Sequence, residues 1–332
     1  MFIQIETMYM DYSKLKSSKI LVTGGAGFIG SNIVSKLLDL GCYVRVIDNL
    51  ITGKKENIEE FINNPNFEFI EGDIRDYNLC LEVCDNIDYV LHQAALGSVP
   101  RSIENPLLSH DINVNGFLNM LYASIQKKVK RFIYASSSSV YGDIQKLPQI
   151  ENKIGNVLSP YALTKKINEL YAILFNKIYS IETIGLRYFN VYGPKQDPKS
   201  KYAAVIPLFI NNTLNNEQST IYGDGTNSRD FTYVEDVVNA NINACLADSN
   251  SSSNVYNIAG GGRTTINELY NKISDIIGLH IESKYEKERS GDIKHSNASI
   301  KKAKKKLLYE PSYNIDTGLK KTIEWYKKKT NK

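Results

Sequence analysis

A glycine-rich stretch near the start of the chain limits the possible folds more than any other feature. It reads KILVTGGAGFIGSNIVSKLLDLG, with a short apolar run at residues 20–23 and helical periodicity at residues 31–40. Between the two lie Gly24, Gly27 and Gly30, spaced as GxxGxxG. Glycines there permit a tight turn, close approach of the backbone to a pyrophosphate, and a helix N-terminus that faces the phosphates. The stretch predicts the first strand, turn and helix of a dinucleotide-binding fold.

A carboxylate follows at the distance that this fold requires. The second predicted strand, YVRVIDNL, ends in Asp48, about twenty residues past the turn. A carboxylate at this place can hydrogen-bond the adenosine ribose hydroxyls and would repel a 2′-phosphate. We therefore expect NAD rather than NADP.

Strand-like and helix-like segments alternate through the first half of the chain. Helical periodicity is clearest at residues 105–126. This alternation predicts a Rossmann-like, doubly wound α/β fold, whose ligands lie beyond the carboxyl ends of a parallel sheet. Three further strands are expected at 67–74, 88–95 and 131–142, ending respectively in Asp73 and Ile74, in Ala94 and Ala95, and in the serine run Ser136 to Ser139.

A tyrosine and a lysine share one face of a predicted helix after these strands. The segment LSPYALTKKINELY begins with Ser159 and Pro160, residue types that favour helix starts. Tyr161 and Lys165 are four residues apart, so their side chains lie on the same stripe. An ammonium group beside a phenol would lower the phenol pKa and make Tyr161 a possible base. Spacing alone is also typical of a solvated helix, so this hypothesis depends on a cofactor and a substrate lying beside the pair.

The composition is that of an ordinary globular protein, with 42% hydrophobic and 23% charged residues. The net charge of +4 owes much to lysine runs at 301–306 and 327–329, which we interpret as solvated helix faces rather than a nucleic-acid site. No signal peptide or membrane span is apparent, so a cytoplasmic location is expected. No metal site is expected, and four scattered cysteines predict buried thiols rather than a disulfide framework.

The combined motifs resemble the extended short-chain dehydrogenase/reductase family, in particular its nucleotide-sugar epimerases. TGGAGFIG, Asp48, the serine run and Tyr161-x3-Lys165 carry the resemblance, which covers nearly the whole chain after the first eighteen residues. Further motifs resemble bacterial UDP-N-acetylglucosamine 4-epimerases of polysaccharide synthesis: HQAALGSVPRS, LSPYALTK, IGLRYFNVYGP, YAAVIP, SRDF and GDIKHS. The resemblance implies that Ser137, four residues before Tyr141, assists catalysis by Tyr161 and Lys165.

The resemblance also implies which residues contact each ligand. Those expected at NAD are Gly24, Gly27, Phe28, Ile29, Gly30, Asp48, Asn49, Gly53, Asp73, Ile74, Gln93, Ala94, Ala95, Asn113, Tyr161, Lys165 and Tyr188. Those expected at the nucleotide sugar are Gly97, Ser98, Ser137, Ser138, Ser139, Tyr161, Asn190, Ala204, Val205, Tyr222, Arg229, Arg289, Asp292 and Ser296. Arg229 and Arg289 would pair with the diphosphate, because guanidinium groups suit phosphate oxygens.

The implied reaction is 4-epimerisation of a UDP-N-acetylhexosamine through transient oxidation of C4 to a ketone. The small Ser296 stands where some relatives carry a bulky tyrosine, so it leaves room for an N-acetyl group. Three alternatives remain open. The substrate could be the uronic-acid form of the sugar, whose carboxylate Arg101 could bind; the protein could be a net dehydrogenase or decarboxylase; or it could be a non-catalytic binding protein. A dehydratase is disfavoured, because Ser138 and Ser139 stand where such relatives carry Asp and Glu.

The expected organisation is two interleaved parts. Residues 19–194 are mainly the NAD-binding domain, residues 195–330 are mainly a mixed α/β substrate lobe with elements that return to the first domain, and residues 1–18 are an extension. The resemblance implies a homodimer formed through helix 105–126 and the helix that carries Tyr161. We expect the C-terminal stretch to form two amphipathic helices that complete the lobe.

Overall fold

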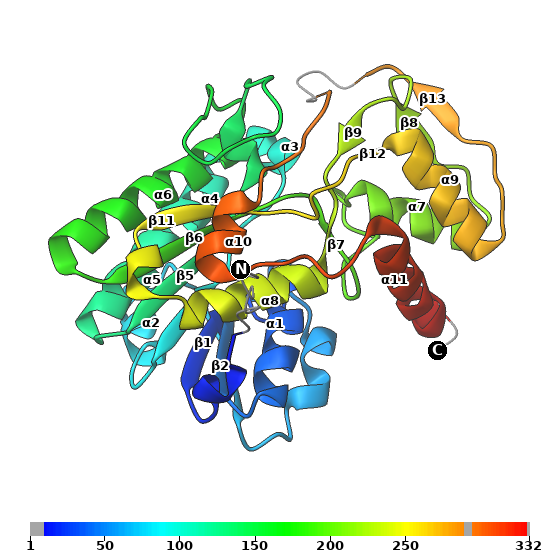
Figure 1. Cartoon of the computed structure of the whole chain (residues 1–332). Helices are drawn as coiled ribbons and strands as arrows, with labels where there is room; N and C mark the ends of the chain where they lie inside the picture. Colours follow the sequence, from blue (N-terminus) through cyan, green and yellow to red (C-terminus); the bar gives the residue numbers. More distant parts are fainter. Residues whose placement is uncertain (1–9, 289–293, 331–332) are drawn as a thin grey trace, which may run out of the picture.

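The computed structural model describes residues 10–288 and 294–330, and these build a parallel sheet with a smaller lobe beside it (Figure 1). The sheet has seven strands in the order β11-β6-β5-β4-β1-β2-β3, and every neighbouring pair is parallel. Its strands are β1 (Lys19–Thr23), β2 (Tyr43–Asp48), β3 (Phe67–Glu71), β4 (Tyr89–His92), β5 (Arg131–Ser137), β6 (Glu182–Tyr188) and β11 (Asn254–Ile258). The predicted doubly wound α/β fold is confirmed.

Helices cover both faces of the sheet because its strands are apolar on both sides. On β5, Ile133 packs into one core, and Phe132 and Tyr134 pack into the other. The core around Ile133 is closed by α1 (Phe28–Asp39) and α8 (Val234–Leu246). The other core is closed by α2 (Tyr77–Val83), α5 (Gly116–Gln126) and α6 (Pro160–Tyr179).

Several strands end a few residues before the predicted positions. β4 was expected to reach Ala95 but ends at His92. Its partner β1 ends at Thr23, the residue paired with His92, because the chain then enters the glycine turn. Residues 93–95 therefore leave the ladder and become free to line a ligand site. β3 likewise ends at Glu71, two residues before Asp73.

The helical stretch predicted at 105–126 is interrupted. It consists of α4 (Pro106–His110), a π-helical turn (Asp111–Asn115) and α5, and a short α3 (Val99–Glu104) precedes it. A π-turn widens the helix locally and is often found at functional sites. Periodicity alone could not reveal this turn.

The described part of the smaller lobe consists of three helices and very short strand pairs. Its helices are α7 (Val205–Leu214), α9 (Ile266–Ile277) and α11 (Ile315–Thr330). Its strands pair as β8 (Thr220–Tyr222) with β13 (Lys284–Glu286) and β9 (Ser228–Arg229) with β12 (Thr264–Thr265), while β7 (Val191–Tyr192) pairs with β10 (Thr232–Tyr233) near the large sheet.

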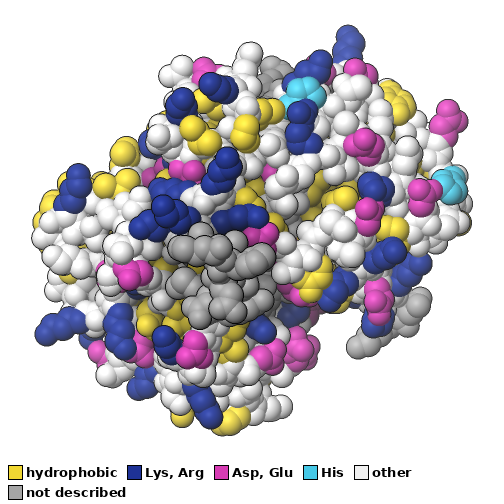
Figure 2. Space-filling view, viewed as in Figure 1, with side chains coloured by type: hydrophobic (Ala, Val, Ile, Leu, Met, Phe, Trp, Pro, Cys, Tyr) yellow, Lys and Arg dark blue, Asp and Glu magenta, His cyan; other side chains and the backbone are white. Residues whose placement is uncertain are grey.

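The prediction for the two C-terminal helices was half right. α11 packs on α7 and α9 in the lobe, but α10 (Lys301–Leu307) packs on β11 and α8 of the large sheet, through the buried Ala303 and Leu307. The lysines of both basic runs mostly face solvent, as predicted, and Figure 2 shows basic side chains gathered over α10. The four cysteines are buried free thiols, and burial raises the pKa of each.

The described part of the N-terminal extension packs against the large domain. A 3₁₀ turn (Tyr12–Leu15) places Leu15 in the core, and the Tyr12 hydroxyl donates to Asn243 Oδ1 on α8 at 2.8 Å. Within the described residues, no helix is long and apolar enough to cross a membrane.

Candidate active site

The glycine turn connects β1 to α1 at the carboxyl edge of the sheet. Gly24 has a φ of +67°, and a Cβ there would lie 2.8 Å from the Ala94 backbone. A Cβ on Gly30 would lie only 2.1 Å from the Gly24 carbonyl oxygen, so α1 could not approach the turn with any larger residue. The turn thus leaves the N-terminus of α1 open toward a ligand at this edge.

Asp48, at the end of β2, stabilises the glycine turn through a hydrogen bond. Its carboxylate accepts hydrogen bonds from the backbone N–H groups of Ala26, at 3.0 Å, and Leu50, at 2.8 Å. Burial raises the pKa of Asp48, and these two bonds oppose that rise. Gly53 packs against the carboxylate, because a Cβ there would lie 2.7 Å from both oxygens. Asp48 lines the adjoining cavity, so its remaining lone pairs can accept from ribose hydroxyls.

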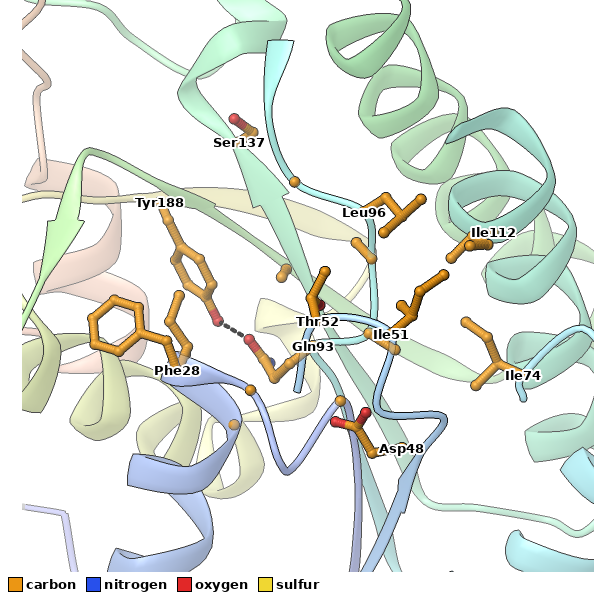
Figure 3. A pocket seen from close by; sticks show the side chains of 18 of the residues that line it. Phe28, Asp48, Ile51, Thr52, Ile74, Gln93, Leu96, Ile112, Ser137 and Tyr188 are labelled. Atoms are coloured by element: carbon orange, nitrogen blue, oxygen red, sulfur yellow. Dashed lines mark hydrogen bonds between the residues drawn. The ribbon is translucent and has the colours of Figure 1, made fainter. Parts of the chain in front are cut away.

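A cavity of about 390 Å³ extends along this edge of the sheet. Figure 3 shows Phe28 and Tyr188 on one side of it and the apolar Ile51, Ile74 and Ile112 on the other. Such apolar walls suit flat rings, while the glycine turn and Asp48 suit phosphates and a ribose. Most of the expected NAD contacts line it: Gly24, Gly27, Phe28, Ile29, Gly30, Asp48, Asn49, Ile74, Gln93, Ala94, Ala95, Tyr161, Lys165 and Tyr188.

Three expected NAD contacts lie behind this wall instead. Gly53 packs on Asp48, as above, and Asp73 accepts from Asn49 and Arg75, which holds its pKa at about 2. Asn113 belongs to the π-turn and is buried. Its amide accepts from the Leu96 N–H at 2.7 Å and donates to the Leu96 carbonyl at 3.1 Å. These residues shape the cavity by fixing the loops that line it.

Tyr188 is held by a closed triangle of hydrogen bonds. Its hydroxyl donates to Gln93 Oε1 at 3.0 Å (Figure 3) and accepts from Asn241 Nδ2 at 2.9 Å. Gln93 Nε2 completes the triangle by donating to Asn241 Oδ1 at 3.1 Å. Burial strongly raises the pKa of Tyr188, so it stays a neutral phenol. Tyr188 therefore serves as a fixed wall and not as a base.

The three predicted catalytic residues meet at one end of the same cavity. Ser137 is the last residue of β5, and Tyr161 and Lys165 lie on the first turns of α6. Ser159 caps this helix by accepting from the Ala162 N–H, and Ser102 of α3 accepts from the Tyr161 N–H at 3.0 Å. The start of α6 is therefore fixed from two sides.

The charges around Tyr161 differ from the prediction. Burial raises the pKa of Tyr161, and the opposing influence is a hydrogen bond with Ser137 rather than the charge of Lys165. Lys165 Nζ is buried and donates to the Ala135 carbonyl at 2.8 Å, and burial lowers its pKa to about 8. A shared helical stripe places the two residues near each other, but the lysine is turned toward the strand.

A second cavity of about 290 Å³ lies in the smaller lobe and shares Asn190 and Val191 with the first. Four of the expected substrate contacts line only this second cavity: Ala204, Val205, Tyr222 and Arg229. Gly97 and Ser137 line the first. Asn190 has a φ of +35° and donates from its amide to the Asp230 carbonyl at 3.0 Å, which fixes it at the junction. A ligand with a sugar and a nucleotide could therefore extend from Tyr161 into the lobe.

The other expected substrate contacts have different positions. Ser98 caps α3 by accepting from the Arg101 N–H, and Ser138 and Ser139 form a 3₁₀ turn after β5. Ser296 is buried beside β9, its N–H donates to the Ser228 carbonyl at 3.0 Å, and its hydroxyl has no hydrogen-bond partner in the described chain. Two further expected contacts, Arg289 and Asp292, lie outside the described residues.

Comparison with known proteins shows which family has this fold and site. The model of the NAD dependent epimerase/dehydratase family matches residues 20–259. The chain belongs to that family. Solved relatives include a UDP-N-acetylglucosamine 4-epimerase from Methanobrevibacter ruminantium in complex with UDP-N-acetylmuramic acid (41% identity, 95% of this chain and 99% of that one, TM-score 0.90). Another is a UDP-glucose 4-epimerase from Thermotoga maritima with UDP-glucose (39%, 94% and 99%, 0.89).

A third relative shows how far substrates vary within the family. A UDP-glucuronate 4-epimerase from Thermodesulfobacterium geofontis is 36% identical over 92% of this chain and 95% of its own. The predicted family is thus confirmed, and its cofactor is NAD. The residues present fit that cofactor: no side chain obstructs the turn at Gly24 and Gly30, and the acidic Asp48 suits a ribose without a phosphate.

The sequence reasoning missed several residues of the site. Ile51, Thr52, Leu96 and Ile112 line the first cavity, and Asn227 and Phe231 line the second. These side chains lie on loops or on the π-turn, where no periodicity marks a buried face. Arg263, on the loop before β12, was also not predicted; it is not among the residues that line the two cavities, but it donates to Ser228 Oγ at 3.1 and 3.2 Å, and Ser228 precedes Arg229 on β9. Its signal was the glycine triplet before it, which allows a sharp turn.

Proposed function

We propose that this protein is a 4-epimerase that interconverts UDP-N-acetylglucosamine and UDP-N-acetylgalactosamine. One observation carries the proposal: Ser137, Tyr161 and Lys165 line the end of the NAD cavity, next to Asn190, where the second cavity begins. The relatives support the substrate class, since those reported above are 4-epimerases of UDP-linked sugars.

The residues divide the chemistry by their positions. NAD, when bound, would accept the hydride of the sugar C4 and return it to the opposite face. Tyr161 would remove the proton from the C4 hydroxyl, and Ser137, whose hydroxyl lowers the pKa of Tyr161, would hydrogen-bond the same sugar oxygen. Lys165, with a pKa of about 8, is mostly protonated at neutral pH and can donate to a ribose hydroxyl of the cofactor. A positively charged nicotinamide would lower the pKa of Tyr161 further.

Preference for the N-acetylated sugar rests on Ser296. Its small, buried side chain keeps an unpartnered hydroxyl within the described chain, next to the segment that carries Arg289 and Asp292 in the sequence. A bulky residue at this position would exclude the larger C2 substituent by a direct clash.

A uronic-acid substrate is the second candidate, favoured by Arg101 on α3. Its guanidinium lies 4.7 Å from the centre of the Tyr202 ring. Among residues 10–288 and 294–330, Arg101 forms no ion pair, so its charge is available to a substrate carboxylate. The Thermodesulfobacterium relative is a 4-epimerase of a UDP-linked uronic acid.

A single assay separates these readings. Purified protein is incubated with UDP-N-acetylglucosamine and, separately, with its uronic-acid counterpart, and the products are resolved by chromatography. We expect the neutral sugar to be converted to its galacto isomer. Conversion of the acid alone would favour the second candidate, accumulation of NADH or CO₂ would indicate a dehydrogenase or decarboxylase, and no conversion would favour a binding protein.

We also propose a homodimer formed through α5 and α6. α6 carries an exposed apolar stripe, Leu170, Leu174 and Ile178, and α5 adds the part-exposed Tyr122. The two helices pack side by side on the same face of the sheet (Figure 1). Light scattering after size-exclusion chromatography should give twice the chain mass for the wild type and the monomer mass for Leu174→Asp. A wild-type monomer would refute this assembly.

A further inference from the structure

β5 and α6 are joined at three consecutive strand residues. The Ala135 carbonyl accepts from Lys165 Nζ at 2.8 Å, the Ser136 hydroxyl donates to Glu169 Oε1 at 2.6 Å, and the Ser137 hydroxyl is close enough to Tyr161 to lower the pKa of that phenol. The helix partners are spaced by four residues, so all lie on one stripe of α6. Any slide of the helix along the strand would break the three contacts together.

Glu169 is the most firmly anchored of these helix residues. Arg187 on β6 binds it with two parallel hydrogen bonds, Nε to Oε1 and Nη2 to Oε2, both at 2.8 Å. Arg187 in turn donates to the Glu151 carbonyl at 3.0 Å and lies 4.8 Å from the centre of the Tyr141 ring. Glu169 is 1% exposed and Arg187 2%, so this ion pair lies wholly inside the protein.

Stability alone gives little reason for such a pair. Taking two charges out of water costs much of what their attraction returns, and apolar side chains of similar size would pack as well. What the pair adds is direction, because a bidentate guanidinium–carboxylate contact permits one geometry. Here that geometry presents Oε1 to the hydroxyl of Ser136, the neighbour of Ser137.

We propose that Ser136 and Glu169 are positioning residues for catalysis: they fix the register of α6 on β5 and thereby align Tyr161 with Ser137. The inference rests on the proposed function of Tyr161 and Ser137. Neither positioning residue needs to touch the sugar, since both act through the adjacent pair. Glu169 does not line the first cavity; Ser136 does line it, but the Ser136 hydroxyl donates to Glu169 on α6.

Ser136→Ala tests the proposal because it removes one hydroxyl and leaves the ion pair intact. Thr183→Val is the matched control: Thr183 Oγ1 on β6 donates to the Ala172 carbonyl at 3.1 Å, so it also ties α6 to the sheet with a buried hydroxyl, but far from Tyr161. We expect kcat to fall about ten- to a hundredfold in Ser136→Ala, with KM nearly unchanged, since small misplacements of reacting groups are costly. The control should keep kcat within about twofold of the wild-type value. Its melting temperature should fall by about as much as that of Ser136→Ala.

The pH profile distinguishes positioning from general loosening. The Ser137 hydrogen bond lowers the pKa of Tyr161, so a misaligned bond should raise that pKa and move the acid limb of kcat to higher pH. The charged and titratable groups on α6 and on the elements packed around its start include Lys165, Lys166 and Glu169 on α6 itself, His92 on β4, Tyr141 in the turn after β5, Arg187 on β6, Arg101 and Glu104 on α3, His110 on α4 and Asp111 on the π-turn. None of them is substituted in the variant, and only Glu169 loses a hydrogen bond. An unshifted limb, or an equal kcat loss in the control, would overturn the proposal.

A substrate-free readout keeps this test separate from the proposed reaction. The titration of Tyr161 can be followed by tyrosinate absorbance, as the difference between each protein and its Tyr161→Phe counterpart. Titration at higher pH in Ser136→Ala supports the positioning role, and identical titration in wild type and variant refutes it. If the wild type converted no UDP-sugar, the proposed function would fail, but this titration would still decide the positioning role.

Discussion

The two cavities rest on different kinds of structure. The first lies on the carboxyl ends of a seven-stranded parallel ladder, and the second lies among strand pairs two or three residues long. A long ladder sets its own register through many successive hydrogen bonds and continuous apolar packing. The short pairs of the lobe depend instead on single polar anchors. The structure around the cofactor cavity is thus held by many contacts, whereas the structure around the substrate cavity depends on a few polar side chains.

Asp230 illustrates such an anchor in the lobe. Its buried carboxylate accepts from the N–H groups of Gly261 and Ala298 and from the amide of Asn297. It thereby joins the segment after β9, the turn before β12 and the segment that follows Ser296. Burial raises the pKa of Asp230 to about 6, because the carboxylate has lost contact with water in making these hydrogen bonds.

The largest expected effect is a loss of turnover caused by a change in the first cavity. Tyr161→Phe removes the hydroxyl that acts as base, so kcat should fall by about 10²- to 10⁴-fold, the usual range for acid–base catalysis. NAD binding should persist, because the ring and the cavity wall remain. Turnover and bound NAD are measured on the same preparation, and near-normal turnover would refute the assigned role.

Loss of Asp230 should disturb only the lobe. Asp230→Ala leaves the buried N–H of Ala298 without an acceptor and removes the carboxylate contacts to the Gly261 N–H and the Asn297 amide, which should lower the free energy of unfolding by about 3 kcal/mol. The KM of the nucleotide sugar should rise, while NAD affinity should stay close to that of the wild type. Asp224→Ala is the control, because among the described residues the hydrogen bonds of this exposed lobe carboxylate go only to Thr226 in its own turn. Equal effects of both variants would mean that the lobe has no special anchor.

Asp48→Ala should instead weaken the cofactor side alone. The variant loses one hydrogen bond to the glycine turn, from the Ala26 N–H, one to the loop after β2, from the Leu50 N–H, and the expected acceptor for the ribose. Hydrogen bonds to a charged group contribute about 1.5 to 3 kcal/mol, so NAD affinity should fall roughly ten- to a hundredfold. Titration calorimetry measures that loss. If the KM of the sugar changed as much as NAD affinity, the two cavities would not be separable.

The smallest expected effect is on a lobe helix. Thr265 and Glu268 form a reciprocal capping box at the start of α9. Thr265→Ala should cost about 1 kcal/mol in the free energy of unfolding, without changing kcat. Urea denaturation measures this cost, and an unchanged midpoint would show that packing alone holds the helix.

The contrast between the long sheet and the short strand pairs also explains which features could be predicted from the sequence. The alternating strands and helices, the glycine turn at Gly24, Gly27 and Gly30, and Asp48 followed from the sequence pattern, because ladder geometry relates sequence distance to position. The other NAD contacts were expected only from the family resemblance. The π-turn that carries Asn113 and the direction of Lys165 Nζ depend on tertiary contacts that periodicity does not encode. Nor could spacing reveal that Asp230 anchors the lobe, because its partners lie 31 to 68 residues away along the chain.

The most direct test of the account follows the C4 hydrogen. UDP-N-acetylglucosamine deuterated at C4 is converted by the purified protein in ordinary water, and the product is examined by NMR. We predict a UDP-N-acetylgalactosamine that retains deuterium at C4, because the hydride removed beside Tyr161 is returned within the same closed site. Loss of the label to solvent, or no galacto product at all, would contradict the proposed mechanism.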